Sequence, residues 1–185
     1  MVLWNIVLSG YPGCGKTTLA KKLVMEKPRF IRVSSDDLRA MLFNKVFPCE
    51  DEEFVYEIIG NIRDLALEAH YNVVIDTTSP NNVTREFLLK TKIKPVNSLL
   101  VVFDVKREVL IERNKMKGQN DAVEIWDRYW EPPSIDFPVI RFKNNNEEEF
   151  NLSYDYLSEL LEGKVYPFKE KGFPHIFPLR KILGK

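Results

Sequence analysis

Long apolar runs and an excess of charge are both missing from this sequence. No stretch reaches the roughly 18 apolar residues that a membrane-spanning helix needs, so we expect no contact with a membrane. The 27 lysines and arginines are balanced by 27 aspartates and glutamates. A formal charge of zero argues against a protein coated in nucleic acid. It leaves room for a local basic groove, because electrostatic steering depends on how charges are distributed.

Cysteine is scarce as well. Cys14 and Cys49 stand alone, and neither belongs to a CxxC pair or to another metal-ligand spacing. Two isolated thiols are typical of a reducing compartment. The apolar residues 1–8 lack the basic region and the cleavage site of a signal peptide, so we interpret them as a strand. We therefore predict a cytoplasmic protein, and the sequence shows no obligate protein partner.

The chain has the length of one ordinary domain. A chain of 185 residues, 44% of them hydrophobic, buries about 70% of the surface that it exposes when unfolded, and it needs no metal or disulfide to fold. We predict a domain over residues 1–163 and a tail over residues 164–185, in which aromatic and basic residues are mixed. The tail is either an arm that contacts RNA or a strap packed on the domain.

Apolar runs alternate with helical periodicities along the chain. Strands are predicted at residues 3–8, 30–33, 73–76, 99–103 and 139–142. Helices are predicted at residues 16–25, 34–43, 51–70, 81–90, 106–115, 121–130 and 150–161. In helix 51–70, spacings of three and four predict an inner face of Phe54, Ile58, Ile62, Leu65 and Ala69. The alternation predicts an α/β fold with an open, mostly parallel sheet and helices on both faces.

The most specific motif is Gly10-Tyr-Pro-Gly-Cys-Gly-Lys-Thr17, a full match to G-x-x-x-x-G-K-[ST] between a predicted strand and a predicted helix. Gly10, Gly13 and Gly15 allow a tight loop whose N–H groups surround a phosphate, aided by the helix N-terminus. Lys16 reaches the β- and γ-phosphates of a nucleotide, and the Thr17 hydroxyl can bind Mg²⁺. The motif therefore predicts a P-loop NTPase fold that binds ATP with Mg²⁺.

Two other residues of this segment are candidates for ATP binding. Thr18 either touches the α-phosphate or is a simple first-turn residue of the helix. Cys14 lies near the helix N-terminus, where the pKa of a thiol can be lowered. We favour the other interpretation of Cys14, as a small residue at a variable position of the loop.

The two motifs of a regulatory GTPase are incomplete. The nearest matches to D-x-x-G and N-K-x-D are Asp76-Thr-Thr-Ser79 and Asn114-Lys-Met-Lys117, and each fails at its last residue. Asp76 ends an apolar strand, as a carboxylate that holds the Mg²⁺ shell does, or it is a turn aspartate before Pro80. The sequence therefore disfavours a GTPase and keeps a magnesium role for Asp76.

Acidic and basic residues follow the second predicted strand. Asp36 is placed where the carboxyl ends of parallel strands share one crevice, so it can lie opposite Lys16 and accept a proton from an acceptor hydroxyl. Arg39 falls on the same helix face and can hold an acceptor phosphate. The alternative is a plain helix start, in which Asp36 caps the helix, Asp37 favours the helix dipole and Arg39 is solvated.

Basic residues also end the helix predicted at 106–115. Arg113, Lys115 and Lys117 precede Gly118, which suits a mobile lid that brings cations onto a triphosphate. The alternative is a solvated helix end that the dipole favours. Trp126, Tyr129 and Trp130 follow, and they either stack on a base or belong to the core.

Four segments in this order, GYPGCGKTT, SSDDLRAMLF, VVIDTTSPNNVTRE and FDVKREVLIERNKMKG, resemble the polynucleotide-kinase-like group of P-loop kinases. The resemblance covers residues 2 to about 131 and implies roles for four residues. Asp36 is the implied general base, Arg39 the contact to the acceptor phosphate, and Arg113 and Lys117 the lid cations. The sequence departs from the group at Lys117, where a second lid arginine is usual, and at Thr78, where the group has asparagine.

These observations predict an ATP- and Mg²⁺-dependent kinase that transfers the γ-phosphoryl group to a hydroxyl. The resemblance points to a polynucleotide 5′-hydroxyl or to tRNA as the acceptor. A nucleoside-type small-molecule kinase stays open, as does an ATP-hydrolysing module that phosphorylates no acceptor.

Overall fold

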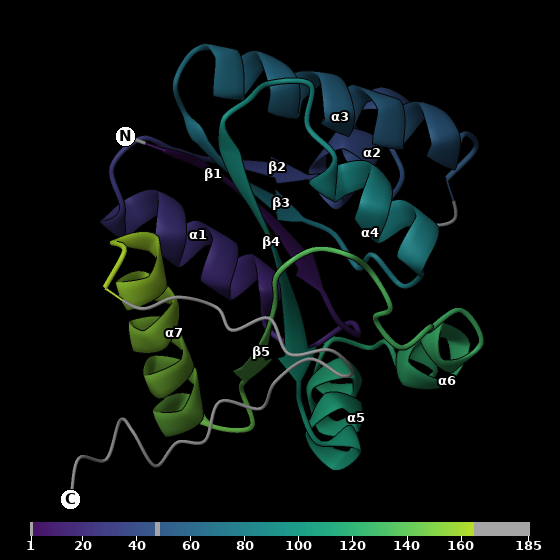
Figure 1. The fold of residues 1–185 in the computed structure, drawn as a ribbon. Helices are drawn as coiled ribbons and strands as arrows, with labels where there is room; N and C mark the ends of the chain where they lie inside the picture. Colours follow the sequence, from purple (N-terminus) through teal and green to yellow (C-terminus); the bar gives the residue numbers. More distant parts are fainter. Residues whose placement is uncertain (1, 47–48, 165–185) are drawn as a thin grey trace, which may run out of the picture.

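The computed structural model describes residues 2–46 and 49–164 as a sheet between two layers of helices (Figure 1). All five strands are parallel, in the order β2-β3-β1-β4-β5. Their bounds are β1 Leu3–Ser9, β2 Phe30–Ser34, β3 Asn72–Asp76, β4 Val96–Asp104 and β5 Val139–Lys143. The predicted fold class, a parallel α/β sheet of the P-loop type, is confirmed.

Seven helices connect or follow these strands in the described part of the chain. Their bounds are α1 Lys16–Glu26, α2 Ser35–Phe43, α3 Glu52–Glu68, α4 Asn82–Leu89, α5 Arg107–Met116, α6 Ala122–Asp127 and α7 Glu147–Leu161. Buried residues of α1, α5 and α7 pack in one cluster on one face of the sheet, and those of α2, α3 and α4 pack in another on the opposite face (Figure 1). The central strand β1 contributes residues to both clusters, because Ile6 and Leu8 pack in the first and Val7 packs in the second.

The predicted inner face of α3 is wrong by about one residue. Phe54 and Leu65 are 45% and 65% exposed, whereas Val55, Ile59 and Leu67 are fully buried. Apolar residues at neighbouring positions of this helix form two overlapping series with the same spacing. Periodicity alone could not select between the two series, and the packing against the sheet does so.

The start of α7 lies three residues before the predicted one, because capping and charge extend the helix beyond its apolar residues. The side chain of Asn146 accepts a hydrogen bond from the backbone N–H of Glu149 at 2.9 Å. Three glutamates occupy the first turn, where the helix dipole favours negative charge.

Of the helices within residues 2–46 and 49–164, none combines the length and the apolar character that crossing a bilayer requires. The predicted C-terminal tail, residues 164–185, lies outside the described residues except for Lys164. Its role as an arm or a strap stays a prediction.

Candidate active site

The glycine-rich segment forms a closed loop between β1 and α1. Gly13 and Gly15 adopt φ angles of +80° and +104°, which side chains with a Cβ rarely tolerate. The backbone N–H of Gly10 donates to the carbonyl of Thr78 at 3.1 Å and so ties the loop to the end of β3. The Lys16 ammonium donates to the carbonyls of Gly10 and Tyr11 at 2.8 and 3.0 Å, so it lies within the curve of the loop.

Two buried asparagines support this loop from elements far along the chain. Asn114 of α5 donates its side-chain amide to the carbonyl of Pro12 at 2.8 Å, and Asn144, just after β5, donates to the carbonyl of Cys14 at 2.8 Å. Asn114 is fully buried and Asn144 is 8% exposed. The loop is therefore held in shape by side chains as well as by its glycines.

Replacing Asn144 by alanine is expected to destabilise the protein and to weaken ATP binding. The buried carbonyl of Cys14 would lose its donor, at a cost of about 1–3 kcal/mol. For a domain of this size that corresponds to about 2–4 °C in Tm for each kcal/mol. Thermal melts with and without ATP measure both effects, and Asn97→Ala, at an exposed position of β4, is the matched control. Equal melting temperatures for the two variants would contradict a supporting role of Asn144.

A cavity of about 550 Å³ lies beside the loop and brings most of the predicted site residues together. They come from the phosphate loop and α1, from α2, from the end of β3 and from the segment after α5. The predicted residues that line it are Gly13, Gly15, Lys16, Thr17, Thr18, Asp36, Arg39, Asp76 and Lys117. The segment from Lys117 to Trp126, which includes most of α6, forms one wall, in the place where the sequence predicts a lid.

Arg113 lies apart from this group of residues. It lines a neighbouring cavity of about 560 Å³ with Thr18, Lys117 and Phe150. Its guanidinium lies 3.4 Å from the carbonyls of Gly13 and Asn145, on the outer side of the phosphate loop. Arg113 is therefore close to the loop but does not line the cavity that holds Asp36.

The helix start at α2 differs from the plain capping arrangement. Ser34, not Asp36, caps the helix by accepting from the backbone N–H of Asp37 at 3.2 Å. The Asp36 carboxylate instead pairs with Arg39 at 2.7 Å, and Arg39 is only 7% exposed. The alternative in which Asp36 caps and Arg39 is solvated is wrong.

Glu52 of α3 holds the other side of the Arg39 guanidinium. Its two carboxylate oxygens accept from Arg39 at 3.0 and 2.8 Å, and Ser35 Oγ accepts at 3.2 Å. Burial alone would lower the pKa of Arg39, but the hydrogen bonds and charge of Glu52 outweigh it and raise that pKa. Arg39 is thus a permanent cation whose charge is already shared by two carboxylates.

Asp76 is held by a neighbour that the sequence did not predict. Arg32 of β2 donates to Asp76 Oδ2 at 2.8 and 2.7 Å, and it also pairs with Asp37 at 2.5 Å. The strand register sets Asp76 beside Ser34, so the carboxylate reaches the cavity at the level of α2. Its free Oδ1 and the Thr17 hydroxyl are oxygen donors, the type that Mg²⁺ prefers.

No cluster of three or more His, Cys, Asp or Glu side chains suited to a metal occurs among residues 2–46 and 49–164. Thr17 and Asp76 supply only two donors. Mg²⁺ commonly binds proteins through one or two such ligands and takes the rest from water and substrate phosphates. The residues therefore fit an ion that arrives with ATP.

The side chain of Cys14 belongs to the core. It is 1% exposed, and burial raises the pKa of its thiol despite the neighbouring Lys16. Burial therefore disfavours a thiolate at this position, and Cys14 contributes to the loop through its backbone.

The three aromatic residues after the lid separate into different environments. Trp130 packs against Tyr11, with ring centroids 4.8 Å apart, as a core residue would. Trp126 lines the 550 Å³ cavity, and Tyr129 is 57% exposed.

Sequence reasoning missed Arg32, Glu52, Asn114 and Asn144. One of them carried a usable signal, because Arg32 interrupts the apolar run from Phe30 to Val33, and a charge in a buried strand needs a partner. Asn114 lies 102 residues from Pro12, and Asn144 lies 130 residues from Cys14, so only the fold reveals these two contacts.

Comparison with known proteins agrees with this fold. A family model for an AAA domain matches residues 6–131, about two thirds of the chain. The APS kinase of Mycobacterium tuberculosis is 18% identical, with a TM-score of 0.66 over 88% of this chain and 99% of that one. A gluconokinase from Sinorhizobium meliloti is 16% identical, with a TM-score of 0.62 over 88% and 97%. A chain of the Pnkp1/Rnl/Hen1 complex is 26% identical, with a TM-score of 0.55, over 60% of this chain and 39% of that one.

Proposed function

Starting from a chain that belongs to the AAA domain family and has a P-loop kinase-like fold, we propose that it transfers the γ-phosphoryl group of ATP to a hydroxyl of a small molecule. One observation carries the proposal. A single cavity joins the phosphate loop, the Asp36 carboxylate and the wall that contains α6, so both substrates of a kinase can meet there.

The phosphate loop and its neighbours act on ATP. The loop amides and the Lys16 ammonium hold the β- and γ-phosphates, and Lys16 offsets the charge that develops on the transferred group. The Thr17 hydroxyl and Asp76 hold the Mg²⁺ of the substrate MgATP, which neutralises phosphate charge. Lys117 reaches the same cavity from the opposite wall, and Arg113 stands on the outer side of the loop.

Asp36 acts on the acceptor. Its carboxylate accepts the proton of the attacking hydroxyl while the new O–P bond forms and the bond between the γ-phosphorus and the β,γ-bridging oxygen breaks. ADP leaves with the bridging oxygen. Arg39 pairs with Asp36 at 2.7 Å and so fixes the direction of the carboxylate toward the cavity.

The charges of the cavity favour an uncharged acceptor. Three cations and three carboxylates line it: Lys16, Arg39, Lys117, Asp36, Asp76 and Asp121. Lys16 and Lys117 face the triphosphate, and Arg39 is shared between Asp36 and Glu52. A phosphate-bearing acceptor would have to displace one of these carboxylates. A volume of about 550 Å³ lies in the range of small-ligand sites, which run from about 300 to 1,000 Å³.

A polynucleotide 5′-hydroxyl is the second candidate acceptor. The 26% identity to a chain of the Pnkp1/Rnl/Hen1 complex and the resemblance of residues 34–43 to the polynucleotide-kinase-like group support it. In that case Arg39 would release Asp36 or Glu52 to bind a backbone phosphate.

A phosphoryl-transfer assay with γ-labelled ATP tests the two acceptor classes. The panel contains sugars, polyols, nucleosides, short 5′-hydroxyl oligonucleotides and tRNA. We expect label on a sugar, polyol or nucleoside with kcat/KM above that for any oligonucleotide. Label on oligonucleotides or tRNA alone would establish the second candidate. Release of phosphate without a labelled acceptor would show that the protein hydrolyses ATP and phosphorylates none of these acceptors.

Replacing Arg39 by alanine is expected to lower kcat/KM for the acceptor by about 10- to 100-fold and to leave the KM for ATP nearly unchanged. The variant removes a charged hydrogen bond worth about 1.5–3 kcal/mol. Steady-state kinetics for both substrates measure the change, and Lys90→Ala, an exposed cation of an i,i+4 pair, is the control.

Glu52→Gln separates the two acceptor classes further. This variant removes the negative charge that Glu52 places beside the Arg39 guanidinium. It should therefore tighten binding of a phosphate-bearing acceptor and have little effect on an uncharged one. An Arg39→Ala variant with wild-type kinetics for every acceptor would contradict the role of Arg39.

A further inference from the structure

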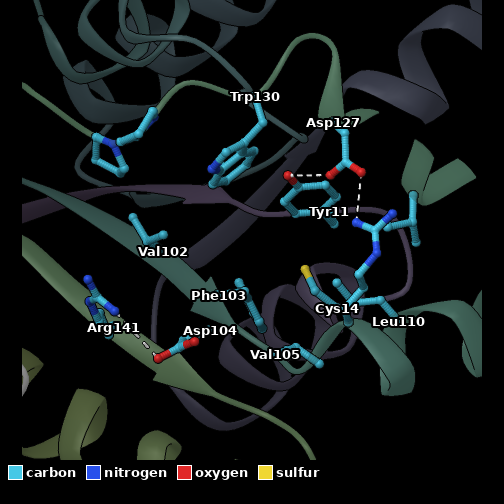
Figure 2. Close-up of a pocket in the computed structure, with 14 residues that line it drawn as sticks. Tyr11, Cys14, Val102, Phe103, Asp104, Val105, Leu110, Asp127, Trp130 and Arg141 are labelled. Atoms are coloured by element: carbon cyan, nitrogen blue, oxygen red, sulfur yellow. Dashed lines mark hydrogen bonds and ion pairs between the residues drawn. The ribbon is translucent and has the colours of Figure 1, made fainter. Parts of the chain in front are cut away.

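A separate cavity of about 350 Å³ lies at the carboxyl ends of β4 and β5, against the side of the phosphate loop formed by Tyr11 and Cys14 (Figure 2). Residues of α5, α6 and the segment 130–133 close it. It shares no lining residue with the two cavities described above. Neither ATP nor the acceptor of the proposed kinase accounts for it.

About half of the wall of this cavity is apolar, and its aromatic part is fixed in place. Val102, Phe103, Leu110 and Val123 contribute to it, together with the aromatic ring of Trp130. That ring is held from two sides. The Tyr11 ring lies 4.8 Å from it, and the guanidinium of Arg85 lies 4.8 Å from its centroid.

Arg85 makes this arrangement rigid. It is fully buried and donates to the carbonyls of Ser79, Pro80 and Glu131 at 2.9, 2.9 and 2.7 Å. A wall held by so many contacts needs little reorganisation to receive a flat ring.

Two charged pairs lie at opposite ends of the cavity, and they differ in the distance between their charged atoms (Figure 2). Asp127 accepts from Arg107 at 2.7 Å and from the Tyr11 hydroxyl at 3.0 Å, which closes one end. At the other end, Arg141 Nη1 lies 3.6 Å from Asp104 Oδ2, which is too long for a direct hydrogen bond. The side chains of Asp104 and Arg141 are 46% and 33% exposed, so both can reorient toward a ligand.

We propose that this cavity binds a nucleoside whose base carries both an amino and a carbonyl group, as guanine and cytosine do. Asp104 accepts hydrogen bonds from the amino edge, and Arg141 donates to the carbonyl oxygen. The base lies against the apolar wall beside Trp130 and Phe103. Adenine offers Arg141 only a ring nitrogen in place of a carbonyl oxygen, and uracil offers Asp104 a single ring N–H in place of an amino group, so each is a poorer match to the two side chains.

Isothermal titration calorimetry with four nucleosides tests this site in the absence of ATP. Guanosine or cytidine is expected to bind up to about 10-fold more tightly than adenosine and uridine, because each of the latter two gives one of the two side chains a poorer hydrogen-bond partner. Asp104→Asn and Arg141→Met should each lower the affinity for the preferred nucleoside by about 10-fold or more. Both positions are partly exposed, so both variants should fold, and a circular dichroism melt verifies this.

Arg39→Ala is the matched control, because it changes the 550 Å³ cavity and leaves this one intact. Its affinity for the preferred nucleoside should equal that of the wild type. The proposal is overturned if no nucleoside binds, if Asp104→Asn and Arg141→Met bind like the wild type, or if Arg39→Ala abolishes binding. The last result would place the nucleoside in the acceptor cavity. None of these measurements depends on kinase activity, so failure here leaves the proposed function standing.

Discussion

Replacing Lys16 by alanine is expected to abolish phosphoryl transfer and to leave the fold intact. The Lys16 ammonium donates to the loop carbonyls of Gly10 and Tyr11 and lies 3.7 Å from the Cys14 sulfur, and Lys16 itself is not a member of either core cluster. The phosphates of ATP need this cation most when charge develops during transfer. Removing a cation or donor that stabilises a transition state lowers kcat by about 10²–10⁵-fold, and we expect at least about 10³-fold.

Lys22→Ala is the control for this variant. Lys22 lies on the same helix, pairs with Glu26 at 2.6 Å and lines neither the 550 Å³ nor the 560 Å³ cavity. Its turnover should match the wild type. Far-UV circular dichroism and a thermal melt establish that both variants fold. Normal turnover of Lys16→Ala would contradict the assigned role of Lys16, and an unfolded Lys16→Ala protein would contradict its independence from the core.

The sequence predicted the sheet, the order of the elements and the phosphate loop, because their signals are local. β1 is a short apolar run that leads directly into the loop, and the loop leads directly into α1. Each of these segments is defined by residues that neighbour one another in the chain. The face of α3 was missed because its choice depends on packing against β2 and β3, and the sequence of the helix allows two faces.

The candidate site was only half predictable for the same reason. Residues at strand ends, such as Asp36 and Asp76, could be placed near Lys16 because parallel strands end at one edge of the sheet. The side chains that hold them in position belong to other elements. Glu52 binds Arg39 from the next helix, and Arg32 binds Asp76 across the β2–β3 pair. Such contacts depend on side-chain direction, which the motif does not encode.

Asp37 illustrates how the structure changes the interpretation of a motif. The aspartates of the Asp36-Asp37 pair point to different partners, since Asp36 pairs with Arg39 and Asp37 pairs with Arg32. Asp36 lines the cavity together with Lys16, and Asp37 does not. Asp37 can influence the reaction only indirectly, because it contacts Arg32, which in turn contacts Asp76.

Replacing Asp36 by asparagine is therefore expected to lower kcat by about 10²–10⁴-fold, the usual contribution of a positioned proton acceptor, and to leave the KM for ATP unchanged. The amide oxygen of asparagine can still accept from Arg39, so the variant keeps the contact at 2.7 Å and loses only the basicity of the carboxylate.

Asp37→Asn is the matched control on the neighbouring residue. It should change kcat much less, because a weaker hold on Arg32 shifts Asp76 without removing a proton acceptor. Steady-state kinetics on both variants, with the acceptor found in the panel, distinguish the two carboxylates. A larger loss for Asp37→Asn than for Asp36→Asn would make Asp37 the base, and it would require the side chain of Asp37 to leave Arg32 and turn into the cavity.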